Sequence, residues 1–256
     1  MTRFIGVLSG KGGVAKTTTS INLAVALNYF GKDVTVIDAN LTTPNIGVYL
    51  GVPVVPINFH HVLQGVNNLA DAVYSHPCGI KIIPASIALE DLKKTKPDKM
   101  PKLISMLYGT TDFVIVDGAA GLGKEAFGTI KSVDEVLIVT NPELPAITDA
   151  LKTIRLCEEM GKEVTGVVLT KTLPDSIGIS ARNVETILEK PIISIVPYDP
   201  NVREALRLRD AVVCTHPNSV ASNSYKTLAA NILGEDFIVE KSKKGLFKRL
   251  RDRLWG

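Results

Sequence analysis

The fold is decided by the stretch Ser9-Gly10-Lys11-Gly12-Gly13-Val14-Ala15-Lys16-Thr17-Thr18. It follows a short apolar run, residues 3–8, and opens a long helical pattern, residues 16–30. A glycine-rich loop between a strand and a helix lets backbone N–H groups surround phosphate oxygens, and the helix N-terminus adds the positive end of its dipole. Lys16 is then expected to reach the β and γ phosphates, and Thr17 to offer a hydroxyl to Mg²⁺. The stretch therefore predicts a nucleotide-binding phosphate loop.

Outward from this loop, short apolar runs alternate with helical patterns along the chain. The predicted strands are residues 3–8, 33–38, 80–84, 112–117, 135–140, 163–169 and 192–196. The predicted helices are residues 16–30, 100–108, 143–160, 179–189 and 219–233, and Gly31 and Gly161 follow two of them as expected C-terminal caps. Strands rich in β-branched residues with helices between them indicate a doubly wound, mostly parallel α/β sheet. We expect one P-loop domain over residues 1–233.

Composition narrows the class of protein. The chain has 256 residues, of which 45% are hydrophobic, and its three cysteines, Cys78, Cys157 and Cys214, form no CxxC motif. That pattern favours buried, reduced thiols in a cytoplasmic protein and indicates neither a zinc nor an iron–sulfur site. Charge is uneven: residues 240–256 carry a net +5, and the rest of the chain carries −2. A mildly acidic body with a basic tail disfavours nucleic acid as a partner and favours an anionic surface.

The string Lys11-Gly12-Gly13-Val14-x-Lys16-Thr17 resembles the deviant Walker A motif of the MinD and ParA ATPases. The resemblance implies a homodimer that forms on binding ATP and Mg²⁺, in which the signature lysine, Lys11, crosses to the partner's phosphates. Lys11, Lys16 and Asn40 are then the expected catalytic residues. The nucleotide is expected to contact Gly10, Lys11, Gly12, Gly13, Val14, Ala15, Lys16, Thr17 and Thr18. The family usually has glycine at position 15, so a positive φ there would make Ala15 costly by about 1–2 kcal/mol.

Two further segments resemble the switches of that family. Asp38 matches the first acid of switch I, and Asp117, at the end of an apolar strand, matches the Walker B acid. With Thr17, these carboxylates are the expected Mg²⁺ ligands. The second switch I acid is replaced by Asn40, whose amide can orient water but cannot accept a proton. Because of Asn40, hydrolysis is expected to be slow, or absent in a protein that only binds ATP. Residues 118–123 are the expected switch II.

The base of the nucleotide is expected at the carboxyl ends of later strands, because ligands of open α/β sheets bind along that edge. Thr170, Lys171, Pro197 and Asp199 occupy positions that resemble the adenine side of the family's site. Thr170 stands where the family has asparagine, and each of these residues is also consistent with plain loop structure. The preference for ATP over GTP comes from the resemblance alone.

The C-terminal residues form a separate pattern. After a linker over residues 234–242, residues 243–256 place Leu246, Phe247, Leu250 and Leu254 within one helical arc, with Trp255 at its edge and basic residues around it. That composition is typical of a helix lying in a membrane interface, and it resembles the membrane-targeting sequence of MinD proteins. A helix packed on the body and a peptide bound by another protein are the alternatives.

Together, these features predict a MinD-like ATPase, peripheral on the cytoplasmic face of the cell membrane, that recruits a partner for cell division or spatial organisation. In the family, partner binding involves the segment around Asp149. Two alternatives remain open: a very slow or non-hydrolysing ATP-gated membrane scaffold, supported by Asn40, and a ParA-like DNA-partitioning ATPase.

Overall fold

A computed structural model describes residues 1–173 and 179–238. The strands are β1 (Arg3–Ser9), β2 (Val34–Asp38), β3 (Tyr74–Ser75), β4 (Lys81–Ile83), β5 (Phe113–Ala120), β6 (Glu135–Thr140), β7 (Glu163–Thr172) and β8 (Ile192–Pro197). The α-helices are α1 (Lys16–Tyr29), α2 (Ile46–Tyr49), α3 (Phe59–Gln64), α4 (Leu89–Lys94), α5 (Met100–Ile104), α6 (Lys124–Lys131), α7 (Leu144–Glu159), α8 (Ala181–Leu188), α9 (Pro200–Arg207), α10 (Val212–Thr215) and α11 (Val220–Leu233). Three 3₁₀ helices, η1 (Leu69–Ala72), η2 (Pro97–Lys99) and η3 (Ser105–Leu107), complete the described elements.

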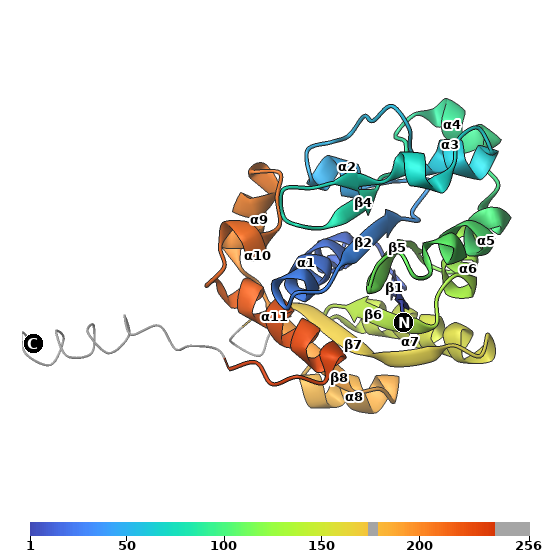
Figure 1. Ribbon diagram of the computed structural model, residues 1–256. Helices are drawn as coiled ribbons and strands as arrows, with labels where there is room; N and C mark the ends of the chain where they lie inside the picture. Colours follow the sequence, from blue (N-terminus) through green and yellow to red (C-terminus); the bar gives the residue numbers. More distant parts are fainter. Residues whose placement is uncertain (174–178, 239–256) are drawn as a thin grey trace, which may run out of the picture.

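The strands form one sheet in the order β3-β4-β2-β5-β1-β6-β7-β8. All neighbouring pairs are parallel except β3 and β4. Helices cover both faces, with α1 and α11 on one side and α6 and α7 on the other (Figure 1). The doubly wound α/β fold predicted from the alternating pattern is confirmed.

Two apolar layers hold the helices to the sheet. Alternate residues of the central strands point to opposite faces, as Ile5 and Val7 do against α1 while Phe4 and Leu8 face the other layer. These strand residues are at most 6% exposed. Because both faces are buried, the strands read as continuous apolar runs, which is why they were recognisable in the sequence.

The predicted boundaries agree within a few residues, with informative exceptions. β5 and β7 continue past their predicted ends, to Ala120 and Thr172, because neighbouring strands still pair with them there. The predicted helix over residues 100–108 is α5 followed by the 3₁₀ helix η3. The antiparallel hairpin of β3 and β4 was not predicted, because β3 has only two residues. The predicted linker starts in the described part of the chain, whereas the predicted tail helix, residues 243–256, lies outside it.

Within the described residues, no helix combines the length and the apolar character needed to cross a membrane.

The first long helix, α1, follows the phosphate loop directly. Its N-cap residue, Ala15, adopts φ 67° and ψ 31°, which is the left-handed region. An L-residue with a Cβ atom is disfavoured there by about 1–2 kcal/mol.

We therefore expect Ala15→Gly to raise the free energy of unfolding by up to about 1 kcal/mol, because the relieved strain exceeds the extra freedom of glycine in the unfolded chain. Urea unfolding of the nucleotide-free protein measures this change. Ala26→Gly is the control, because Ala26 lies within α1 and is buried, so glycine there should lower stability by at least about 1 kcal/mol through lost helix propensity and a lost core methyl group. Equal losses in both variants would contradict the strain at Ala15.

Candidate nucleotide site

A cleft of about 800 Å³ lies at the carboxyl edge of the sheet, where β1, β2 and β5 end. The residues that line it come from the phosphate loop and the start of α1, from residues 40–45 after β2, from residues 119–125 at the end of β5 and the start of α6, and from Pro97. Of the residues predicted to bind nucleotide, the cleft is lined by Gly12, Gly13, Ala15, Lys16, Thr17, Thr18 and Asn40. The phosphate loop and the two predicted switch segments therefore line the same cleft.

Asp117 is the centre of this site. Its carboxylate is fully buried, and its Oδ1 accepts hydrogen bonds from Lys16 Nζ at 2.9 Å and Ser20 Oγ at 2.8 Å. Its Oδ2 accepts one from Thr17 Oγ1 at 2.6 Å. The structure thus brings the predicted Walker lysine, the hydroxyl ligand and the Walker B acid into direct contact. Ser20, one turn after Lys16, belongs to the same cluster and was missed, because a serine inside a helix gives no signal in the sequence.

Asp38 lies beside Asp117, since the two residues are register partners on β2 and β5. Its Oδ2 accepts from the backbone N–H groups of Asn45 and Ile46, each at 2.9 Å, and its Oδ1 accepts from that of Asn40 at 3.2 Å. Burial, followed by the negative charge of Asp117, raises the pKa of Asp38 well above its usual range, and the backbone hydrogen bonds and Lys16 oppose that rise only in part. Two carboxylates side by side in a buried site call for a compensating cation.

Residues of β7 and α7 hold the phosphate loop in place. The Thr170 hydroxyl donates to the Val14 carbonyl at 2.8 Å, and Lys171 Nζ donates to the Gly13 carbonyl at 2.6 Å. Gly10 packs so closely on α7 that a Cβ atom would lie 2.2 Å from the carbonyl of Asp149. Glycine is required at position 10 for this contact, which fixes the loop to the helix predicted to bind partners.

The residues present fit a phosphate group and Mg²⁺. No acceptor among the described residues takes a hydrogen bond from the backbone N–H groups of Gly12, Gly13 or Val14. The buried Ser9 hydroxyl, which lines the cleft, likewise has no partner there. A Cβ atom at Gly12 or Gly13 would meet no other atom of the described residues within 4 Å. Unused donors beside a helix N-terminus suit an anion, and the carboxylates of Asp38 and Asp117 with the Thr17 hydroxyl are the oxygen ligands that Mg²⁺ prefers.

The other predicted residues lie around the cleft rather than along it. Lys11 is half exposed and its Nζ lies 3.7 Å from Glu143 Oε2. Thr170 and Lys171 hold the phosphate loop through hydrogen bonds to its carbonyls. Asp199 caps α9 by accepting from the Asn201 N–H, and it also accepts from the Ala221 N–H at 3.0 Å. Pro197 ends β8. Contact of Thr170, Lys171, Pro197 and Asp199 with a base stays a prediction, as does the role of Lys11 across a dimer.

Asn40 and Glu125 define the wall opposite the phosphate loop. The Asn40 amide donates to the Thr43 carbonyl at 2.6 Å and accepts from the Thr43 hydroxyl at 3.1 Å, so its hydrogen bonds stay within switch I. Glu125, from α6, accepts from the backbone N–H and the hydroxyl of Thr42 and lines the cleft. It is an acid that the sequence analysis missed, because it lies eight residues beyond Asp117 in a helix with no recognisable motif.

The raised pKa of Asp38 has a measurable consequence. The native protein keeps a proton that the unfolded chain loses, so Asp38 makes stability fall as pH rises from about 4 through the raised native pKa. We expect Asp38→Asn, without Mg²⁺ or nucleotide, to lose less stability than the wild type between pH 5 and pH 8. Urea unfolding at both pH values measures this, with the half-exposed Asp33→Asn as control. An unchanged pH dependence in Asp38→Asn would contradict the assignment.

Comparison with known proteins identifies the family of this chain. Residues 1–233 match the ParA family model, described as a NUBPL iron-transfer P-loop NTPase. An ATP-binding protein of Methanocaldococcus jannaschii is 37% identical over 240 residues, which cover 94% of this chain and 91% of that protein.

Two solved structures are similar throughout. The septum site-determining protein MinD of Pyrococcus horikoshii, complexed with Mg-ADP, is 33% identical with a TM-score of 0.87, over 91% of this chain and 96% of that one. MinD in the MinC:MinD complex of Aquifex aeolicus is 27% identical with a TM-score of 0.82, over 93% and 99% of the two chains. With the phosphate loop and its buried carboxylates in place, the chain belongs to the ParA family of P-loop NTPases, as a MinD-like member.

Proposed function

We propose that this protein is an ATP-driven switch: it dimerises around Mg²⁺ and ATP, attaches to the membrane through residues 243–256, and recruits a protein partner involved in cell division or spatial organisation. The observation that carries the proposal is the buried cluster of Lys16, Thr17 and Asp117 in a cleft whose N–H donors suit phosphate. The Mg-ADP bound by the MinD of Pyrococcus horikoshii supports the same ligands for this chain.

The cluster suggests how the residues respond to nucleotide. Lys16 and Thr17 are held by Asp117 and line the cleft, so a small rotation would turn both toward a phosphate. Bound Mg²⁺ supplies positive charge that offsets the phosphates and the paired carboxylates. Asp38 would then lose its proton, because a nearby cation favours the charged carboxylate.

We assign the dimer contact to Lys11 because its side chain is accessible to a second copy of the chain. Its side chain is 46% exposed, and its contact with Glu143 is a solvent-exposed pair. Such pairs contribute about 0–1 kcal/mol, so Lys11 can leave Glu143 at little cost. The signature-lysine resemblance then supports a contact with the nucleotide of a second copy.

The partner surface is assigned to α7. Asp149 is 37% exposed, and its backbone carbonyl lies against Gly10 of the phosphate loop. A shift of the loop on binding nucleotide would therefore press on the helix that a partner contacts. The MinC:MinD complex of Aquifex aeolicus supports a protein partner for this class of chain.

Membrane attachment would follow from having two tails. Each basic residue near an anionic surface contributes about 1 kcal/mol, and an apolar side chain that is only partly buried gains less than the roughly 1.5–3 kcal/mol of full burial. One tail should therefore bind reversibly, and two tails on one dimer should bind together through effective concentration. In this way ATP-dependent dimerisation becomes peripheral attachment on the cytoplasmic face of the membrane.

Turnover separates this switch from a second candidate, a membrane scaffold that binds ATP and barely hydrolyses it. The Asn40 amide is engaged with Thr43 and cannot accept a proton, which favours slow hydrolysis. Glu125 is the carboxylate on the same wall of the cleft, and its bonds to Thr42 hold switch I near α6.

The test is co-sedimentation of the intact protein with anionic liposomes under ATP, ADP or no nucleotide, with phosphate release measured in the same tubes. We expect ATP alone to drive pelleting of the wild type. Leu250→Glu should reduce this pelleting at least about tenfold, through lost burial and added repulsion. Lys11→Ala should pellet no more with ATP than with ADP, because it cannot form the dimer. Lys32→Ala is the matched control for Lys11, because it changes a partly exposed lysine three residues past the end of α1, away from the phosphate loop.

Pelleting that ignores nucleotide would contradict the coupling of dimerisation to attachment, and pelleting of Leu250→Glu like the wild type would contradict the role of the tail. Phosphate release then decides between the two candidates. Steady release identifies a hydrolysing switch, and ATP-dependent pelleting without release identifies the scaffold.

A further inference from the structure

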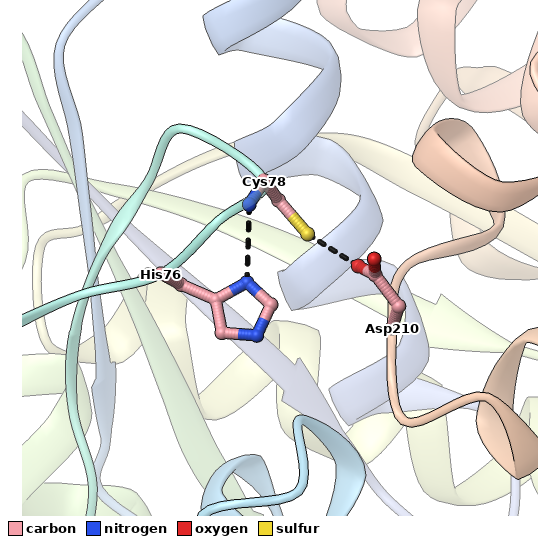
Figure 2. A group of neighbouring side chains, drawn as sticks. All are labelled: His76, Cys78 and Asp210. Atoms are coloured by element: carbon pink, nitrogen blue, oxygen red, sulfur yellow. Dashed lines mark hydrogen bonds between the residues drawn. The ribbon is translucent and has the colours of Figure 1, made fainter.

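A second group of chemically active side chains lies away from the nucleotide cleft. His76, Cys78 and Asp210 each offer a ligand atom, and these atoms lie within 4.8 Å of one another (Figure 2). Cys78 donates from its thiol to Asp210 Oδ1, and its backbone N–H donates to His76 Nδ1 at 3.3 Å. All three residues are partly buried, so a small ion can reach them from solvent. The phosphate-loop chemistry uses none of them.

The three side chains leave a place for an ion between them. The Cys78 thiol donates to the Asp210 carboxylate, so a cation that replaced this proton would bind the sulfur and the carboxylate oxygen together. Cys214, in α10, is exposed and does not belong to the group.

The two segments that carry the ligands are fixed. His76 and Cys78 lie in the turn between β3 and β4, which is closed by the His76 N–H to the Ile80 carbonyl at 2.9 Å and the Gly79 N–H to the His76 carbonyl at 2.9 Å. Asp210 follows the end of α9, where its N–H donates to the Ala205 carbonyl at 3.1 Å. Ligands on rigid turns keep their spacing, which is what a metal site requires.

We propose that His76, Cys78 and Asp210 form a Zn²⁺ site that joins the β3–β4 turn to the segment between α9 and α10. One imidazole, one thiolate and one carboxylate are ligands that Zn²⁺ accepts, and a water would complete its tetrahedral geometry. Bond lengths of about 2.0–2.3 Å require ligand atoms about 3.5 Å apart, so the widest separation of 4.8 Å closes by rotation of the side chains.

The role of this site is structural. Cys78 and Asp210 are 132 positions apart in the sequence, and the ion would tie the antiparallel edge of the sheet to the helical layer over α1. An ion that binds only the folded chain stabilises it by mass action. The site is separate from the Mg²⁺ ligands Asp38 and Asp117 and does not depend on the proposed function.

The test is titration of the intact, reduced protein with Co²⁺ in the presence of Mg-ADP, followed by Zn²⁺ displacement. Thiolate ligation gives Co²⁺ an intense charge-transfer absorption that the oxygen ligands of a Mg²⁺ site cannot produce. We expect one equivalent of Co²⁺ to develop this band. Cys78→Ser and Asp210→Asn should each weaken binding at least about tenfold. His61→Ala is the matched control, because His61 faces Asp91 at 3.6 Å in a pair without cysteine.

A second measurement needs no variant. Alkylation of Cys78 in the wild type, followed by mass spectrometry, should slow at least about tenfold when one equivalent of Zn²⁺ is present, because the metal-bound thiolate is shielded. Cys214, which is exposed and is not a proposed ligand, serves as the internal reference. Absence of the charge-transfer band, an equal band in Cys78→Ser, or alkylation of Cys78 that ignores Zn²⁺ would overturn the proposal.

Discussion

The structure depends on one buried carboxylate. Asp117 is fully buried at the end of β5 and is held there by Lys16, Thr17 and Ser20, all from the first turns of α1. A buried charge without partners is expensive, so the sheet tolerates Asp117 only with the helix beginning where it does. The same contacts aim the lysine and the threonine at the cleft. Folding and ligand binding therefore share this cluster.

Strain and close packing around the phosphate loop follow from that arrangement. Ala15 takes a left-handed conformation, and the backbone of α7 leaves no room for a side chain at Gly10. Thr170, on β7, donates a hydrogen bond to the Val14 carbonyl. A change in the shape of this loop would therefore act on α7 and on β7. The same rigidity that displays N–H donors to a phosphate would thus carry a change at the nucleotide toward Asp149 and its neighbours.

The sequence predicted the fold, the phosphate loop and the buried acids, because a parallel sheet requires continuous apolar strands and the loop has a recognisable spacing. It failed where contacts join distant segments. Ser20 and Glu125 have no motif, and Cys78 meets Asp210 only because the β3–β4 turn lies beside the segment that follows α9. The expectation of three buried thiols was correct only for Cys157, since Cys214 is exposed and Cys78 partly buried. Residue separation hid the cluster, because no pattern in the chain marks which turns fold together.

The most direct test of the central claim is calorimetric titration of the wild type and Asp117→Asn with ATP, each with and without Mg²⁺. If Asp117 organises the site, Mg²⁺ should strengthen ATP binding by the wild type at least about tenfold, and the variant should lose that gain while staying folded, because an amide brings no charge to the metal. If Asp117→Asn keeps the full gain from Mg²⁺, the carboxylate does not hold the metal and this account of the site is wrong.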